Sequence, residues 1–130
     1  MCEKCGCDKK RVCRGPVSTV DKPWGGEELL AHTDLYALKR IRVKPGSRPS
    51  LQYHERKSES LYLLSGLMKI EIGDSKDSLL VDELRPGETV DIPRGKIHRV
   101  TALEDSVLIE ASTPELDDVV RLEDDYGRRS

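Results

Sequence analysis

Aromatic residues are scarce in this chain. Phenylalanine is absent, and tryptophan occurs only at Trp24 among the 130 residues. The interior must therefore be built mainly from leucine, isoleucine and valine, which suits β-strands and a barrel. The length is sufficient for one domain with its own core, because a chain of this size buries roughly two-thirds of its unfolded surface.

Long apolar runs are also missing. No segment approaches the ~20 apolar residues that cross a bilayer, and the N-terminus lacks the apolar stretch of a signal peptide. The formal net charge of −2 gives no general reason to expect nucleic-acid binding. No phosphate-binding loop of the form G-x4-G-K-[ST] occurs. We therefore expect a cytoplasmic protein that binds neither membranes nor nucleic acid.

Short alternating segments follow one another along the chain. Ile41 and Val43 fall on one side of a predicted strand at 36–44, and Arg42 falls on the other. Lys39 shares the side of Ile41 and Val43, so its side chain is predicted to point inward. Further strands are predicted at 28–32, 61–64, 68–72, 79–84, 89–92, 98–103 and 106–112. About nine or ten short strands without a helix are typical of a double-sheet jelly roll.

Two short blocks contain residue types that bind metals. Gln52 and His54 lie two positions apart, which places both side chains on one face of a strand, and Glu59 follows after four residues. The second block brings His98 after a turn that contains Pro93. A single histidine on a strand is more often part of a hydrogen-bonded scaffold, but two blocks with fixed internal spacing favour a site. Because four nitrogen and oxygen ligands suit a divalent metal, we predict that Gln52, His54, Glu59 and His98 bind one.

The two blocks resemble the paired motifs of the cupin superfamily, G-x5-H-x-H-x(3,4)-E-x6-G and G-x5-P-x-G-x2-H-x3-N. The first runs from Gly46 to Gly66 and the second from Gly87 to Ala102. Gln52 stands in place of the first histidine, and Ala102 stands in place of the asparagine. The resemblance implies an all-β cupin double-stranded β-helix, that is, a jelly-roll barrel, with a divalent metal.

A glutamine at the first ligand position is similar to the phosphomannose isomerases, whose metal is held by Gln, His, Glu and His. The segment from Lys22 to Arg128, which closes on V-R-x-E-D-x-Y-G-R, resembles the C-terminal cupin of bifunctional mannose-1-phosphate guanylyltransferase/mannose-6-phosphate isomerases. The guanylyltransferase half has no counterpart in this sequence. The resemblance implies an aldose–ketose isomerase that acts on a small sugar phosphate with zinc, or with Mn, Fe, Co or Ni.

Charged residues gain roles from the same resemblance. Lys57 occupies a K-x-E position at which type I isomerases have a lysine thought to assist catalysis, whereas the bifunctional enzymes have arginine there. A base must carry the proton between two carbons, and a nearby metal would lower the pKa of Lys57. Glu110 is the second catalytic candidate, and it faces either inward or toward solvent. Since cationic side chains bind phosphate, the predicted substrate contacts are Lys39, Arg99, Arg121 and Arg128.

All four cysteines lie near the N-terminus, at Cys2, Cys5, Cys7 and Cys13. In a reducing cytoplasm such a cluster favours a soft metal over disulfides, and a basic tail with exposed thiols remains the alternative. Over a few residues this segment resembles the N-terminus of hydrogenase nickel-insertion GTPases. The turn at Gly15 and Pro16 separates it from the rest. We therefore predict a cysteine-rich segment at 1–16 and a single cupin domain at 17–130.

Three functions remain open from the sequence. The isomerase is favoured by Gln52 and by the C-terminal segment. A cupin dioxygenase would also fit, because iron is held by two histidines and a carboxylate in such enzymes. A non-enzymatic sugar-binding or metal-binding barrel is favoured by Glu55 and Arg56, which replace two histidines of the bifunctional motif. We also predict a homodimer, because a small jelly roll leaves edges and an apolar face that pairing can cover.

Overall fold

The computed structural model describes residues 12 and 14–128. The predicted metal site at Cys2, Cys5, Cys7 and Cys13 lies outside these residues and stays a prediction. Within the described part of the chain, no helix is long and apolar enough to cross a membrane.

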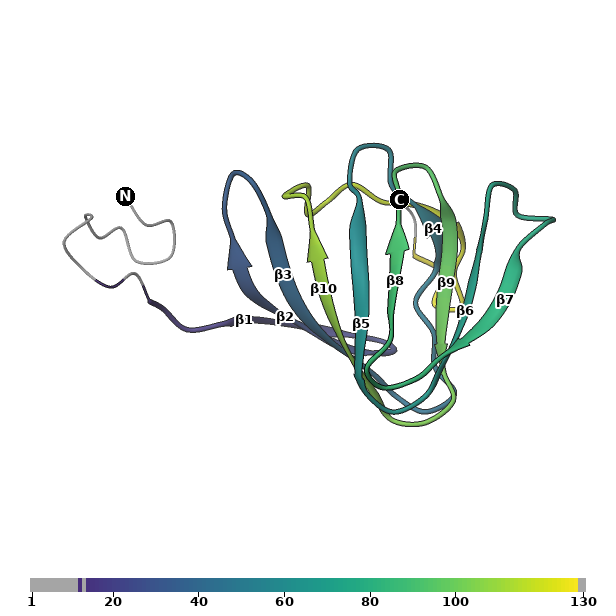
Figure 1. Cartoon of the computed structure of the whole chain (residues 1–130), viewed down its shortest axis with the longest axis horizontal. Coiled ribbons are helices and arrows are strands. Elements are labelled where there is room, and N and C mark those ends of the chain that lie inside the picture. Colours follow the sequence, from purple (N-terminus) through teal and green to yellow (C-terminus); the bar gives the residue numbers. More distant parts are fainter. Residues whose placement is uncertain (1–11, 13, 129–130) are drawn as a thin grey trace.

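Residues 14–128 form an all-β fold, as the alternating segments predict (Figure 1). The strands in this part of the chain are β1 (Ser18–Lys22), β2 (Gly25–His32), β3 (Ala37–Val43), β4 (Leu51–Tyr53), β5 (Glu59–Ser65), β6 (Met68–Gly73), β7 (Leu80–Leu84), β8 (Thr89–Ile92), β9 (Ile97–Ala102), β10 (Ser106–Ser112) and β11 (Val120–Glu123).

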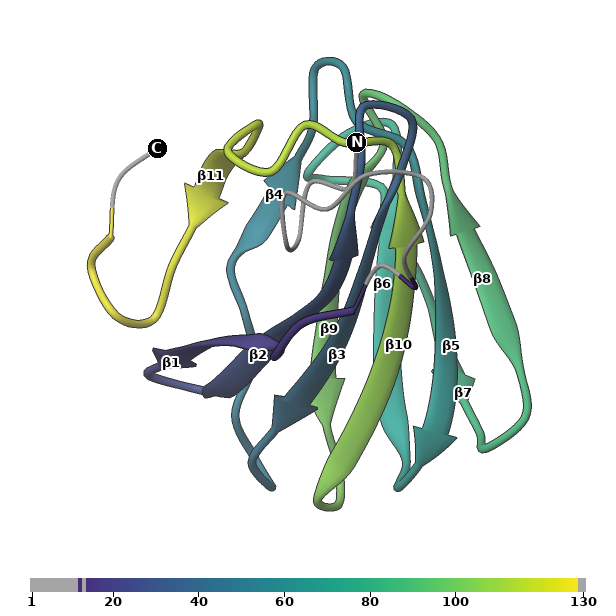
Figure 2. The same ribbon diagram turned by 90° about the vertical axis from the view of Figure 1, so that its left-hand side faces the viewer.

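The strands build two antiparallel sheets that face each other. One sheet has the order β1-β2-β3-β10-β5-β8, and the other has the order β11-β4-β9-β6-β7. Successive strands change sheets, as β3 to β4 and β4 to β5 do, so the two layers are linked repeatedly as in a jelly roll. Figure 2 shows the short pair of β4 and β11 at one margin of the barrel.

The core between the sheets is aliphatic, as the lack of phenylalanine predicts. Every second residue of each strand points inward, and the most deeply buried large side chains are Val43, Leu63, Met68, Ile92 and Leu108. Trp24 joins this cluster and is 4% exposed. The core therefore fills the barrel interior with apolar side chains, and any polar residue that points inward lies against them.

Gly66, the last residue of the first motif, has a backbone reason to be glycine. Its φ is 97°, a left-handed conformation that other residues rarely adopt. A Cβ at this position would also collide with the side chain of Ser106 and the backbone carbonyl of Asp105. The turn between β5 and β6 is thus packed closely against the start of β10.

Two edge strands differ from the sequence prediction. β1 and β11 were not predicted, and β2 begins at Gly25 rather than at residue 28. β1 is almost entirely exposed and β11 is only four residues long, so neither carries a strong apolar alternation. Their pairing with β2 and β4 depends on backbone hydrogen bonds to strands elsewhere in the chain, which local sequence does not reveal.

Removal of the segment before Val17 is expected to leave the barrel folded. Residues 14–17 are exposed, and the first strand begins at Ser18. A chain that starts at Val17 should therefore melt within about 4 °C of the full chain, which corresponds to about 1 kcal/mol. Thermal unfolding followed by circular dichroism measures this, and a much larger drop would show that the N-terminal segment stabilises the barrel.

The outer face of the six-stranded sheet supports the homodimer prediction. Tyr62 and Leu64 on β5 are 37% and 50% exposed, and Ile109 on β10 lies directly opposite Tyr62. A second copy of the chain would remove this apolar surface from water. Light scattering should give twice the mass of the 14.6 kDa chain, and Tyr62→Glu should shift the protein to monomer. A wild-type monomer at micromolar concentration would contradict the prediction.

Candidate metal centre

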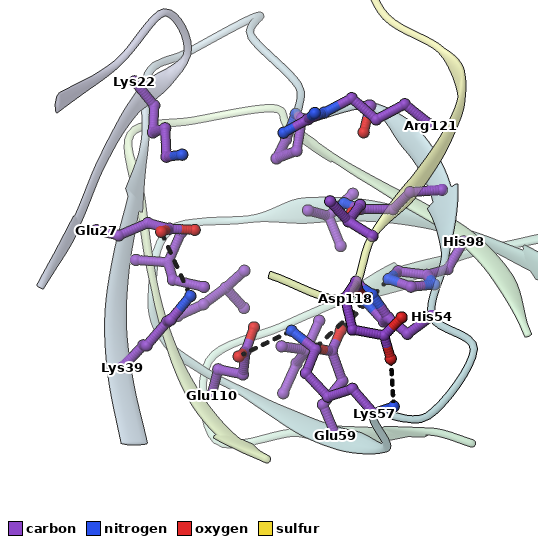
Figure 3. Close-up of a pocket in the computed structure, with 18 of the residues that line it drawn as sticks. Lys22, Glu27, Lys39, His54, Lys57, Glu59, His98, Glu110, Asp118 and Arg121 are labelled. Atoms are coloured by element: carbon purple, nitrogen blue, oxygen red, sulfur yellow. Dashed lines mark hydrogen bonds and ion pairs between the residues drawn. The ribbon is translucent and has the colours of Figure 1, made fainter. Parts of the chain in front are cut away.

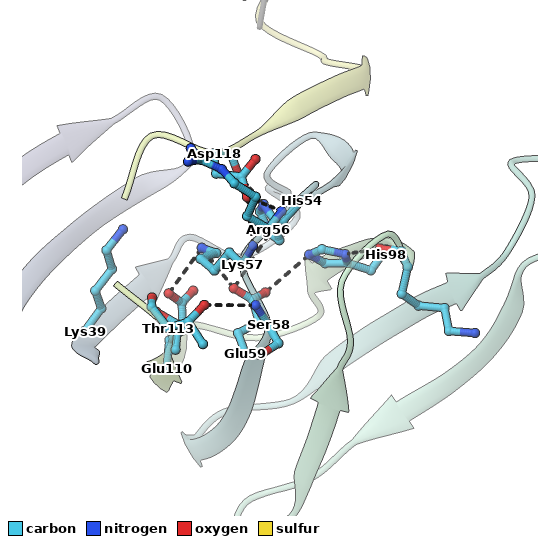
Figure 4. A network of polar contacts seen from close by, with 12 residues as sticks. Lys39, His54, Arg56, Lys57, Ser58, Glu59, His98, Glu110, Thr113 and Asp118 are labelled. Atoms are coloured by element: carbon cyan, nitrogen blue, oxygen red, sulfur yellow. Dashed lines mark hydrogen bonds and ion pairs between the residues drawn. The ribbon is translucent and has the colours of Figure 1, made fainter. Parts of the chain in front are cut away.

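Two histidines and a glutamate converge between the sheets (Figure 4). His54 follows β4, Glu59 begins β5, and His98 lies on β9. Glu59 Oε1 lies 3.3 Å from His98 Nε2, and Glu59 Oε2 lies 3.7 Å from His54 Nε2. The three side chains are buried, and one ligand atom from each lies within 4.8 Å of the others.

Strand alternation points these side chains inward. Glu59 shares the inner face of β5 with Leu61 and Leu63, and His98 shares the inner face of β9 with Val100. The polar groups therefore replace apolar side chains at one part of an otherwise aliphatic interior. Burial of such groups is costly unless they are paired or bind a cation.

The hydrogen bonds of the two imidazoles define which nitrogen faces Glu59. His54 Nδ1 donates to the backbone carbonyl of Asp118 at 2.6 Å, and His98 Nδ1 donates to the carbonyl of Lys96 at 2.9 Å. A carbonyl only accepts, so each Nδ1 carries a proton, and Nε2 is the ring nitrogen of each histidine that faces the Glu59 carboxylate. Three electron-pair donors then converge on one point. This donor set fits a divalent metal, which Nε2 of each histidine and a carboxylate oxygen would hold.

Gln52 lies beside this group. It is directly opposite His98 in the β4–β9 pair and lines the same cavity. The structure thus brings all four residues predicted as ligands to one wall of the cavity, where Gln52 can supply an amide oxygen.

Lys57 lies between Glu59 and Glu110. Its Nζ is 3.0 Å from Glu59 Oε2 and 3.5 Å from Glu110 Oε2. Lys57 and Glu110 are each only 6% exposed, and Glu110 lies on the inner face of β10. The solvent-facing alternative for Glu110 is therefore excluded. A buried ammonium group bridges a predicted ligand and a second carboxyl group.

Burial is the largest influence on the pKa of each member of this triad. Burial together with the charge of Glu59 raises the pKa of Glu110 to about 7, although Lys57 and Lys39 oppose the shift. Burial would lower the pKa of Lys57, but the carboxylates of Glu110 and Glu59 outweigh it and raise that pKa. Burial would raise the pKa of Glu59, yet its hydrogen bonds to His54 and His98 and the Lys57 charge hold its pKa well below the usual range. Glu110 is thus the member that exchanges a proton near neutral pH.

A cavity of about 130 Å³ opens in front of these groups (Figure 3). Four cationic side chains also line it: Lys22, Lys39, Arg121 and Arg128. Glu27 lies 3.4 Å from the Lys39 ammonium and offsets part of this charge. Figure 3 shows Lys22 and Arg121 across the cavity from Glu110 and Glu59. The cavity therefore combines the converging predicted ligands with cationic side chains, which suits an anionic molecule that also reaches a metal.

Arg99 is not part of this cavity lining. It follows His98 on β9 and therefore points to the outer face of the sheet, where its guanidinium donates to the carbonyls of Pro49 at 3.1 Å and Glu123 at 3.0 Å. The predicted contact of Arg99 with a substrate is corrected accordingly: the buried guanidinium holds the C-terminal segment against the barrel. Alternation along the strand was the available signal, since adjacent residues face opposite sides.

Lys22 and Asp118 are among the lining residues that the sequence analysis missed. Lys22 ends β1, and the only local signal was its position before the Pro23-Trp24 turn. Asp118 lies between β10 and β11, and its partners are more than sixty positions away in the sequence. No local pattern indicates such a partner, because the contact exists only after the C-terminal segment has folded back.

Comparison with known proteins identifies the family of this chain. A family model described as "Mannose-6-phosphate isomerase C-terminal" matches residues 10–124. The chain belongs to this family. Among curated members, the chain is 36% identical to the xanthan biosynthesis protein XanB of Xanthomonas campestris pv. campestris (strain B100) over 117 residues. It is also 36% identical over 115 residues to a mannose-1-phosphate guanylyltransferase of Escherichia coli K12. Each match covers 84% of this chain but 23% of the relative.

Solved structures confirm the cupin fold of this family member. KdgF from Halomonas sp. superposes with a TM-score of 0.68 at 24% identity over 77% of this chain and 90% of that chain. An RmlC-like cupin from Shewanella frigidimarina also gives 0.68, at 17% identity over 78% of this chain and 86% of that chain. The all-β jelly roll predicted from the two motifs is therefore correct.

Proposed function

We propose that this protein is a metal-dependent sugar-phosphate isomerase of the mannose 6-phosphate type. The observation that carries the proposal is the buried Lys57 between Glu59 and Glu110, next to the converging histidines. Aldose–ketose isomerisation moves a proton between adjacent carbons, which requires a base that can exchange a proton near neutral pH. Membership in the mannose-6-phosphate isomerase C-terminal family supports this reaction class.

The proton steps are assigned to the triad. When bound, a divalent metal supplies Lewis-acid stabilisation of the negative charge on the sugar oxygens. Glu110 in its carboxylate form takes the proton from C2 of the aldose and returns it to C1, because its pKa of about 7 allows both states. The Lys57 ammonium donates its proton to the carbonyl oxygen at C1 and takes the proton of the C2 hydroxyl in return, so the ammonium is restored when the ketose has formed. Burial of both groups excludes water from the transfer.

In this proposal the cationic residues of the cavity bind the phosphate group of the substrate. Lys39, Arg121 and Arg128, predicted from the sequence, and Lys22, found in the structure, all line the cavity. Guanidinium and ammonium groups bind phosphate through charge-assisted hydrogen bonds. A hexose phosphate whose phosphate binds near Lys22 and Arg121 would direct its C1 and C2 toward Glu110 and Glu59 across the cavity.

The test is a coupled assay for interconversion of mannose 6-phosphate and fructose 6-phosphate. Protein loaded in turn with zinc, manganese, iron, cobalt or nickel should turn over the substrate with at least one of them, and a chelator should abolish the reaction. Metal-replete protein that fails with a panel of hexose and pentose phosphates would refute the proposal.

A binding module without turnover is the second candidate. Glu55 and Arg56 replace two histidines of the bifunctional motif, and the chain spans about a quarter of the length of its curated relatives. In this case a sugar phosphate should raise the melting temperature of the metal-loaded protein while no product forms. The same assay series therefore separates the two functions.

A further inference from the structure

One residue of the C-terminal segment, Asp118, contacts both the predicted ligand His54 and the turn that follows it (Figure 4). Its backbone carbonyl accepts the Nδ1 proton of His54 at 2.6 Å. Its carboxylate accepts the backbone N–H groups of Glu55 at 3.1 Å, Arg56 at 2.6 Å and Lys57 at 2.8 Å. In the described part of the chain, no other residue makes four such hydrogen bonds to His54 and the turn that follows it.

The bond from His54 to the Asp118 carbonyl determines which ring nitrogen of His54 faces the metal site. With Nδ1 bonded to this carbonyl, Nε2 of His54 faces Glu59 and lies 3.7 Å from Oε2. Histidines that bind metals usually have such a partner on the other nitrogen, because it fixes both the tautomer and the ring orientation.

The second set of contacts holds the turn at 55–57. Three consecutive N–H groups point at one carboxylate, which satisfies donors that would otherwise need water. Lys57 closes this turn, and Glu59 lies two residues further at the start of β5. A shift of the turn would therefore move the ammonium group and the ligand carboxylate together.

We propose that Asp118 is a positioning residue that couples the C-terminal segment to the metal centre, by fixing His54 and the turn carrying Lys57 at once. This inference rests on the metal site of the proposed function. The same segment lines the cavity through Leu116 and Val119, so it forms a wall of the site as well as its support. The same segment is also bonded to the outer face of the sheet, where Arg99 donates to the carbonyl of Glu123.

Metal affinity of matched variants tests the coupling. Asp118→Asn and Asp118→Ala should weaken the apparent Kd for Co²⁺ or Zn²⁺, measured by competition with a chromogenic chelator, by about 10- to 100-fold. Asp117→Asn is the control, because Asp117 is the exposed neighbour and the charge change is identical. The apparent Kd of the control should stay within about twofold of the wild-type value. This change is smaller than the 10- to 100-fold loss expected when a residue that orients a metal ligand is replaced. Asp118 variants that bind as tightly as the control would overturn the inference.

A second readout needs no metal and separates this inference from the proposed function. Nitrogen-15 NMR of the metal-free wild type should show the Nδ1–H tautomer for His54, with slow exchange of that proton. The substitution at Asp118 keeps the backbone carbonyl that accepts from His54, so it tests whether the side-chain bonds to the turn hold that carbonyl in place. In Asp118→Ala, which removes those bonds, this proton should exchange faster while circular dichroism remains unchanged. An Nε2–H tautomer in wild type, or an unchanged exchange rate in the variant, would overturn the inference. Wild-type protein that binds no metal would refute the proposed site, and the NMR result would still decide whether Asp118 orients His54.

Discussion

Replacement of Lys57 by alanine is expected to lower turnover of mannose 6-phosphate by about 100- to 10,000-fold, because a general acid–base group contributes this much. Metal content should remain near that of wild type, since Lys57 contributes no ligand to the set of His54, Glu59 and His98. The measurement combines steady-state kinetics with elemental analysis of the same samples. A loss of metal in parallel with activity would show that Lys57 supports the ligand Glu59 instead.

Two further variants test whether Lys57 acts through proton transfer or only through its charge. Lys57→Arg keeps the positive charge between Glu59 and Glu110 but transfers protons poorly near neutral pH. It should therefore remain nearly as inactive as the alanine variant; recovery of activity would mean that Lys57 acts only through its charge. Lys44→Ala is the matched control, because Lys44 is exposed just beyond β3 and outside the cavity lining. Its turnover should equal that of wild type.

Replacement of His98 by alanine is expected to remove the metal. The change deletes one of the converging donors and leaves Glu59 Oε1 without the nitrogen that lies 3.3 Å away. A site for a divalent ion with three rather than four protein ligands binds much more weakly. Metal per chain after dialysis should fall from about one to well below it, and isomerase activity should fall with it.

His32→Ala provides the control for a histidine substitution. His32 Nε2 bonds to the carbonyl of Pro114 at 3.0 Å, and the residue is not part of the cavity lining. This variant should keep full metal content even if its melting temperature drops. If His98→Ala kept full occupancy while folded, the ligand assignment would be wrong.

The metal-site residues were accessible from the sequence because their spacing is local. Gln52 and His54 share a strand face, and Glu59 follows after a short turn, so strand periodicity alone predicts that they approach one another. The approach of His98 could be predicted only from the second motif, because it is the pairing of β4 with β9 that brings His98 opposite Gln52. The resemblance to cupins supplied that link in advance of the structure.

The basic side chains were less predictable, because charge alone does not reveal direction. Lys39 lines the cavity as its alternation with Ile41 indicated, whereas Arg99 points to the outer face and bonds to Glu123. Lys22 was not considered because β1 is an exposed edge strand with little pattern. Each outcome follows from which face of a strand the residue occupies and which strand lies beside it.

The sequence by itself determined the architecture and the residues that converge as predicted metal ligands. An aliphatic composition without phenylalanine, short alternating segments and two spaced motifs were sufficient for an all-β jelly roll with Gln52, His54, Glu59 and His98 at one site. Only the tertiary structure decided the environment of those residues. Burial between the sheets raises the pKa of Glu110 to about 7, and the returning C-terminal segment places Asp118 on His54. Both depend on desolvation and on contacts between segments far apart in the chain, which exist only once the barrel has closed.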